Sequence, residues 1–172
     1  MLDDIVIDTN VLEHARNPGV GFFTDAVKLL KRLLDVETKW CLDEGSRRRE
    51  AWRGSRMYGE YVVRLVPGDL GLSVLTQLAL TERVRLVPRP ARQVREAIAR
   101  NVHDPSDRVF AEVAFGSNGR TLVTHDDAAF TVATARWLRR QLSVDTVDAG
   151  RAFAALSVGG TGTDRSQQAP PT

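Results

Sequence analysis

The sequence predicts an α/β protein with a mostly parallel sheet. Two observations lead to this fold class. Short apolar segments with the composition of buried strands recur along the chain, and longer segments with apolar residues at helical spacing lie between them. The length of 172 residues suits one domain of ordinary size, and no internal repeat is visible.

The individual elements follow from these two patterns. We expect strands at 4–7, 39–42, 84–87, 120–124 and 143–147. We expect helices at 22–35, 69–82, 90–100, 104–115 and 127–141. In the first helix, Phe22, Ala26, Leu29 and Leu33 recur at helical spacing and predict one buried face.

Composition narrows the setting of the protein. A hydrophobic fraction of 42% and a charged fraction of 27% allow a normal globular core. No apolar run approaches the roughly 20 residues of a membrane helix. Acidic residues lie close to Met1, so we expect no secretory signal. Cys41 is the single cysteine, so we expect no internal disulfide and a cytoplasmic location.

The carboxy-terminal segment differs from the rest of the chain. Residues 157–172, "SVGGTGTDRSQQAPPT", are rich in Gly, Ser, Thr, Gln and Pro and carry little apolar content. Such a segment cannot bury enough apolar surface to fold, so we expect a flexible tail. The folded domain is therefore expected to span 1–156.

Polar side chains follow two of the expected strands. Asp8-Thr9-Asn10 comes after the first strand, and Thr124-His125-Asp126-Asp127 ends the fourth. Ligand sites of parallel α/β sheets collect at the carboxyl ends of strands, so these residues are candidates for a site. The alternative for each acidic residue is an ordinary helix N-cap.

A third acidic residue stands out in the stretch "HDPSDRVFAEVA". Asp104 suits the N-cap of a helix that has Pro105 at its first position. Asp107 precedes Phe110 and Ala114 by three and seven residues, which puts a carboxylate on the apolar stripe. A buried charge needs a partner or a metal ion, whereas a solvated Asp107 would only favour the helix dipole.

A further acid is less well defined by the sequence. The candidates are Asp43, Glu44, Glu50 and Glu60. Glu60 precedes Arg64 by four residues, so a surface ion pair is an alternative. An ideal helix also places Glu60 opposite the stripe formed by Tyr58, Tyr61, Val62 and Leu65.

Carboxylates without a matching set of His and Cys favour Mg²⁺ or Mn²⁺ over zinc. The residues His14, His103 and His125 are not spaced as a zinc site, and Cys41 stands alone. A divalent ion held by carboxylates positions a water and stabilises the leaving oxygen of a phosphodiester.

Three segments in this order resemble the PIN (PilT N-terminal) domain family of nucleases: "IVIDTNVL", "DRVFAEVA" and "RTLVTHDDAAF". The segment "SVDTVDAGRAFAAL" looks like the last strand and helix of that fold, so the resemblance covers about residues 4–156. It implies a three-layer α/β/α fold around a central, mostly parallel sheet.

The resemblance also implies site residues and an activity, which is metal-dependent cleavage of RNA and less often of DNA. Asp8, Asp107 and Asp126 match the first, third and fourth acids, which hold the metal ion. Asn10 and Thr124 match the polar residues that support them. We choose Glu60 as the second acid, while Glu44 and Glu50 stay open.

Many relatives of this size are toxins of toxin–antitoxin pairs, so the resemblance also implies an antitoxin-like protein partner and a homodimer. The longer midsection and tail of this chain count against the toxin role. The alternative function is a catalytically silent module that keeps the fold and binds RNA or a protein. A phosphorelay receiver domain, which is also α/β, would need a lysine at the end of a late strand. No lysine follows Lys39, so this class of protein is set aside.

The run "RRREAWRGSR" is a candidate nucleic-acid-binding segment. Its arginines are Arg47, Arg48, Arg49, Arg53 and Arg56. Positive charge beside the carboxylates offsets their repulsion of a polyanion. Trp52 either stacks on an unpaired base or turns toward the core, and the core is the favoured alternative.

Overall fold

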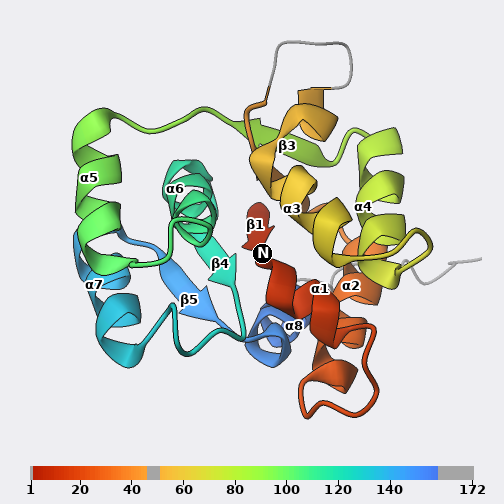
Figure 1. Ribbon diagram of the computed structural model, residues 1–172. Coiled ribbons are helices and arrows are strands. Elements are labelled where there is room, and N and C mark those ends of the chain that lie inside the picture. The colour runs from red at the N-terminus through yellow and green to blue at the C-terminus, as the bar shows by residue number, and fades with distance from the viewer. Residues whose placement is uncertain (1, 46–50, 159–172) are drawn as a thin grey trace, which may run out of the picture.

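The computed structural model describes residues 2–45 and 51–158, and Figure 1 shows a central sheet with helices around it. The strands are β1 (Asp4–Ile7), β2 (Lys39–Asp43), β3 (Val84–Val87), β4 (Thr121–Val123) and β5 (Asp145–Val147). They form one five-stranded sheet in the order β3-β2-β1-β4-β5, and every pair is parallel. The predicted parallel α/β fold is therefore confirmed.

Helices cover the sheet in a three-layer arrangement. They are α1 (Thr9–His14), α2 (Phe23–Asp35), α3 (Arg56–Arg64), α4 (Leu70–Leu80), α5 (Arg92–Asn101), α6 (Arg108–Gly116), α7 (Val132–Leu142) and α8 (Ala149–Val158), with a 3₁₀ turn at Ala51–Gly54. Helices α2, α4 and α8 pack together, while α6 packs on β1, β2 and β4 with α3 and α5 beside it. No helix in the described part of the chain is long and apolar enough to cross a membrane.

The order of the strands creates a switch point beside β1. The chain builds β1, β2 and β3 toward one edge and then returns to add β4 and β5 on the other side of β1. Ligands of open α/β sheets bind at the carboxyl ends of the strands where the order reverses, here between β1 and β4. Asp8 follows β1 and Thr124 follows β4, so both lie at this point.

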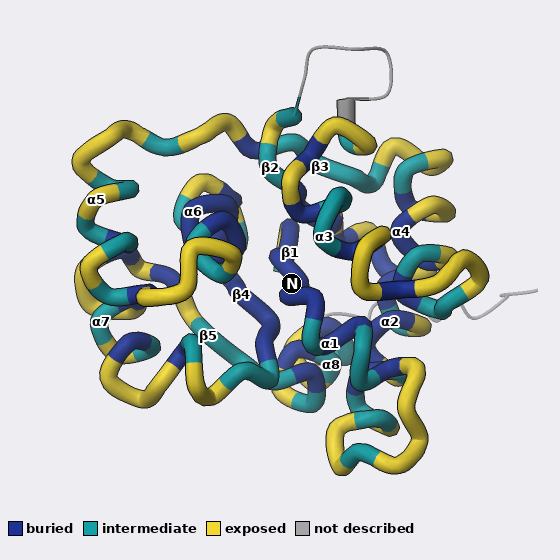
Figure 2. The backbone as a smooth tube through the Cα atoms, in the orientation of Figure 1, coloured by how far each residue is buried: buried dark blue, intermediate teal, exposed yellow. Residues whose placement is uncertain are grey.

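Strand β1 lies in the centre of the core. All four of its residues are buried, as expected for a parallel strand covered on both faces. Figure 2 shows the same burial along β4 and much of α6. Asp4 opens β1 as a buried carboxylate, and it is compensated by Arg85 at 2.8 Å and by the backbone N–H groups of Asn118 and Gly119. Asp4 is thus a structural acid.

Two predicted helices begin later than expected. Asp104 does not cap α6, because its Oδ1 accepts from the N–H and hydroxyl of Ser106 and so closes a turn. Helix α6 starts at Arg108. The helix predicted at 127–141 starts at Val132, and the hydroxyl of Thr131 caps it.

The remaining differences concern short elements and the tail. Helix α1 was not expected, because it has only six residues. A helix around Glu60 was considered but not assigned, because Gly54 and Gly59 weaken its pattern, and the structure forms it as α3. Two residues assigned to the tail, Ser157 and Val158, belong to α8. The rest of the predicted flexible tail, 159–172, lies outside the described residues.

Candidate metal centre

A hydrogen-bonded clamp joins the ends of β1 and β4. Asp8 is 2% exposed, and its Oδ2 accepts from Asn10 Nδ2 and from Thr124 Oγ1, each at 2.7 Å. Asn10 Oδ1 in turn accepts from the backbone N–H of His125 at 2.9 Å. The clamp therefore brings together three side chains that the sequence proposed for the site.

Asp8 does not serve as a helix cap through its side chain. It occupies the position before α1, but its side chain makes no capping hydrogen bond to the backbone N–H groups of the helix. Both donors bind Oδ2, and Oδ1 has no hydrogen-bond partner within the described residues. One oxygen of a buried carboxylate is thus left available.

Glu60 reaches the same region from α3. Its Oε1 accepts a hydrogen bond of 2.7 Å from the hydroxyl of Thr9, which directly follows Asp8. The predicted stripe was wrong in part, because Met57 and Tyr61 form the buried face of α3 and Val62 is 45% exposed. Glu60 therefore flanks the buried face instead of lying opposite it.

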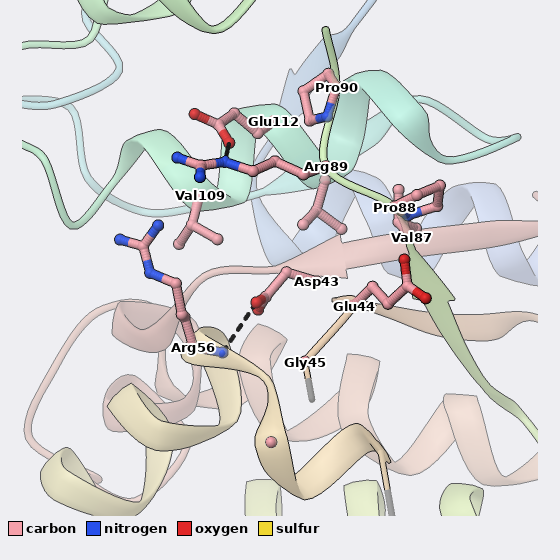
Figure 3. A pocket seen from close by; sticks show the side chains of 12 residues that line it. Asp43, Glu44, Gly45, Arg56, Val87, Pro88, Arg89, Pro90, Val109 and Glu112 are labelled. Atoms are coloured by element: carbon pink, nitrogen blue, oxygen red, sulfur yellow. Dashed lines mark hydrogen bonds and ion pairs between the residues drawn. The ribbon is translucent and has the colours of Figure 1, made fainter. Parts of the chain in front are cut away.

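The other candidates for this acid have different positions. Asp43 accepts from the hydroxyl of Ser55 at 2.6 Å and from the N–H groups of Arg56 and Met57 at 3.0 Å, so it anchors the start of α3. Figure 3 shows the bond to Arg56 and, beside it, Glu44 in the wall of a separate pocket. Glu50 lies outside the described residues.

Asp107 and Asp126 come from the two later segments. Asp107 immediately precedes α6 instead of lying inside a helix, and its half-buried side chain makes no capping bond. Asp126 Oδ1 accepts from the N–H groups of Ala128 and Ala129 at 2.9 and 2.8 Å. The N–H of Asp126 donates to Thr124 Oγ1, which connects this acid to the clamp.

The negative charges of neighbouring acids affect Asp8 and Asp107. Burial raises the pKa of Asp107 to about 7, and the charges of Asp8, Asp126 and Glu60 are among the groups that raise it further. Burial likewise raises the pKa of Asp8 to about 6. The hydrogen bonds from Thr124 and Asn10 lower this pKa, whereas the charges of Glu60 and Asp126 raise it further. Negative charge is therefore concentrated at this end of the sheet.

The carboxylate oxygens are of the ligand type that a hard divalent cation prefers. Asp8, Glu60 and Asp126 each have one oxygen engaged by donors, and the other has no hydrogen-bond partner in the described part of the chain. Carboxylate oxygens are the preferred ligands of Mg²⁺ and Mn²⁺. Across residues 2–45 and 51–158, no three His, Cys, Asp or Glu side chains form a group arranged to hold a metal ion.

A histidine pair that the sequence did not indicate lies next to the clamp. His14 Nδ1 and His125 Nδ1 are 2.8 Å apart, and both rings stack with Phe22. His125 Nε2 accepts a hydrogen bond from the N–H of Ala149. Burial, and to a smaller extent the neighbouring His14, lowers the pKa of His125 to about 4. A neutral His125 thus ties the clamp segment to α1 and α8.

The candidate nucleic-acid-binding arginines are described only in part. Arg47, Arg48 and Arg49 lie outside the described residues. The guanidinium carbon of Arg53 lies 5.1 Å from the centre of the Trp52 ring. Trp52 is half-buried against the core and meets Tyr58 edge to face at 4.9 Å, in agreement with the core alternative. Arg56 is exposed at the start of α3.

Sequence comparison finds no matching family model and no matching curated protein. The resemblance to the PIN domain family therefore rests on the motifs quoted above. The fold class, by contrast, is shown by the strand order and the helical layers.

Proposed function

We propose that this protein is a metal-dependent endoribonuclease of the PIN type. The observation that carries the proposal is the clamp that holds Asp8 beside the switch point, where the charges of Asp8, Asp126 and Glu60 all raise the pKa of Asp107. Like charges that lie near one another and partly out of water are costly to a fold, so their grouping is typical of a functional site. A divalent cation is the ligand that offsets such a charge.

Asp8, Asp107 and Asp126 are the proposed ligands of Mg²⁺ or Mn²⁺, and Glu60 is the fourth acid of the site. An ion bound there supplies Lewis-acid chemistry, since it lowers the pKa of a bound water and offsets charge on the phosphodiester. The protein contributes the position and the charge of the acids.

The surrounding residues prepare these acids for that role. Asn10 and Thr124 donate to one oxygen of Asp8, which favours its ionised form and leaves the other oxygen for a ligand. Thr9 holds Glu60 in the same way through its hydroxyl. These three are positioning residues, because they act through the carboxylates.

The biological setting is part of the proposal. RNA as substrate, an antitoxin-like partner and a homodimer follow from the PIN resemblance alone. A cytoplasmic location is supported by Cys41, whose thiol is buried and free. The toxin role depends on finding such an inhibitory partner.

The proposal is tested by cleavage of labelled mixed-sequence RNA and single-stranded DNA with Mg²⁺, with Mn²⁺ and with EDTA. Asp8→Asn is compared with Asp127→Asn, which changes the exposed neighbour of Asp126. We expect metal-dependent RNA cleavage that Asp8→Asn abolishes and the control retains. Cleavage that persists in EDTA and in Asp8→Asn contradicts the proposal, and RNA binding without cleavage favours the silent module.

A further inference from the structure

A groove lined by arginines is formed by segments that also carry Glu60 and Asp107. Its walls come from the start of α3, the segment after β3, α5 and the start of α6, and its volume is about 570 Å³. We call it the arginine groove and define it by Arg56, Arg89, Arg92, Arg95 and Arg108. Only Arg56 belongs to the candidates that the sequence suggested.

The groove carries an excess of positive charge. Its lining includes five arginines and two acids, Glu96 and Glu112, which leaves three positive charges in excess. Arg92 Nε pairs with Glu96 at 2.6 Å on the exposed face of α5. Arg89 Nε lies 3.8 Å from Glu112, a looser pair than a hydrogen bond.

Two of the guanidinium groups have donors without acceptors. Arg95 Nε is buried and has no hydrogen-bond partner among the described residues. In the same part of the chain, no hydrogen bond or ion pair involves the guanidinium of Arg56, which Figure 3 shows beside Arg89 and Glu112. An unsatisfied buried donor is costly, so Arg95 favours an anionic ligand, and the exposed guanidinium of Arg56 is available to the same ligand.

Another arginine is already oriented. The guanidinium of Arg108 donates to the backbone carbonyls of Val102 and His103 at 2.8 and 2.7 Å. These bonds hold the positive group in place before any ligand binds, which reduces the entropy lost on binding. Glu112 is buried among these arginines, and burial raises its pKa while Arg89 and Arg95 act against the rise.

Two arginines of the groove neighbour acids of the candidate metal centre along the chain. Arg108 follows Asp107 in the chain, and Arg56 precedes Glu60 by four residues on α3, so the two lie about one helical turn apart on one face. A polyanion that reaches the carboxylates is repelled by them, and adjacent arginines offset that repulsion. Arginine also matches the oxygens of a phosphate with two parallel donors.

We propose that the arginine groove binds the phosphodiester backbone of the RNA strand next to the phosphate that is cut. The inference rests on the proposed nuclease function and specifies how the substrate is held. Phosphates flanking the cleavage point lie along α5 and the start of α6. An acidic protein is the competing occupant. The RNA strand is favoured, because it has to reach the neighbouring carboxylates to be cut.

The test measures binding of a 5′-labelled single-stranded RNA of about 20 nucleotides by fluorescence anisotropy, in EDTA so that metal-dependent cleavage is suppressed. Arg89→Gln/Arg92→Gln removes two exposed members of the groove, and Arg136→Gln/Arg140→Gln removes two exposed arginines of α7 as the control. We expect about tenfold or greater loss of affinity for the groove variant at about 0.1 M salt. The slope of log affinity against log salt should shrink by about 1.4, or 0.7 for each lost phosphate contact on a single strand.

A second variant separates charge from geometry. Arg89→Lys/Arg92→Lys keeps the charge and loses the two-pronged donor, so its affinity should lie between those of the wild type and the Gln variant. Circular dichroism melting of each variant checks that it is folded. If the groove variant has the same RNA affinity and the same salt slope as the control variant, the proposal that the groove binds RNA is wrong. A site for an acidic protein predicts that result.

The two proposals fail in different ways. If the wild type cleaves RNA through Asp8 but the groove variant binds RNA normally, the nuclease proposal stands and the groove inference is wrong. If the groove variant loses RNA affinity but no metal supports cleavage by the wild type, the groove stands and the nuclease proposal is wrong.

Discussion

Replacing Asp8 by asparagine should stabilise the metal-free protein at neutral and higher pH. Asp8 is 2% exposed, and its pKa is raised from 3.8 to about 6, chiefly by burial. At 1.36 kcal/mol for each pKa unit, keeping this group ionised costs the folded state about 3 kcal/mol. The side chain introduced by Asp8→Asn keeps an oxygen that accepts from Asn10 and Thr124, and it carries no charge.

The sign of the pH dependence follows from the raised pKa. The folded chain binds this proton more tightly than the unfolded chain, so the stabilising contribution is fully present below about pH 4 and is lost as the pH rises through about 6. We therefore expect Asp8→Asn to be more stable than the wild type by about 1–3 kcal/mol near pH 8 and nearly equal to it near pH 4. Urea denaturation in EDTA at both pH values measures the difference in unfolding free energy.

Asp4→Asn is the matched control, because Asp4 begins β1, the strand that Asp8 follows, and is equally buried. The carboxylate of Asp4 pairs with Arg85 and accepts hydrogen bonds from two backbone N–H groups. Removing this charge should therefore destabilise the protein by about 3 kcal/mol near pH 8. If Asp8→Asn destabilises the protein by the same amount at both pH values, the reasoning about crowded carboxylates is refuted.

Three further predictions concern the same region. Mg²⁺ or Mn²⁺ at about 100 times its dissociation constant should stabilise the wild type by about 2.7 kcal/mol in thermal melts near pH 8, and an equal gain in Asp8→Asn contradicts the proposed ligand. Thr9→Val removes the donor that holds Glu60 and should lower kcat about 10–100-fold, whereas Thr9→Ser should retain most activity, and equal rates for both variants contradict the positioning role. His14→Ala should raise the pKa of His125 from about 4 in an NMR titration, because His14 is one of the groups that lower it, and an unchanged pKa shows that burial alone sets the value.

Local patterns were sufficient to locate the strands of the sheet. Short apolar runs such as Asp4–Ile7 carry their own signal, since a strand buried on both faces must be apolar throughout. The polar residues after β1 and β4 were equally visible, because Asp8, Asn10 and Thr124 interrupt apolar segments. Their direct contact depended on β4 pairing with β1 across more than a hundred residues.

The choice of the further acid could not be made from local sequence. Asp43 ends a buried strand just as Asp8 follows one, yet its oxygens are occupied by Ser55 and the first N–H groups of α3. Glu60 was expected to lie opposite an apolar stripe, and only the packing of Met57 and Tyr61 turned it toward Thr9. Helix packing, which sequence spacing does not encode, made the difference.

The sequence by itself determined the α/β class, the strands and the chemistry of the acids, because periodicity and residue type act over a few neighbours. Only the tertiary structure decided which polar groups share a hydrogen bond, which acids influence one another and where the arginines gather. Arg56, Arg89 and Arg108 come from three separate segments and line one groove only after β2, β3 and α6 have packed. Burial and electrostatic coupling depend on distance in space, and for residues this far apart in the chain the fold sets that distance.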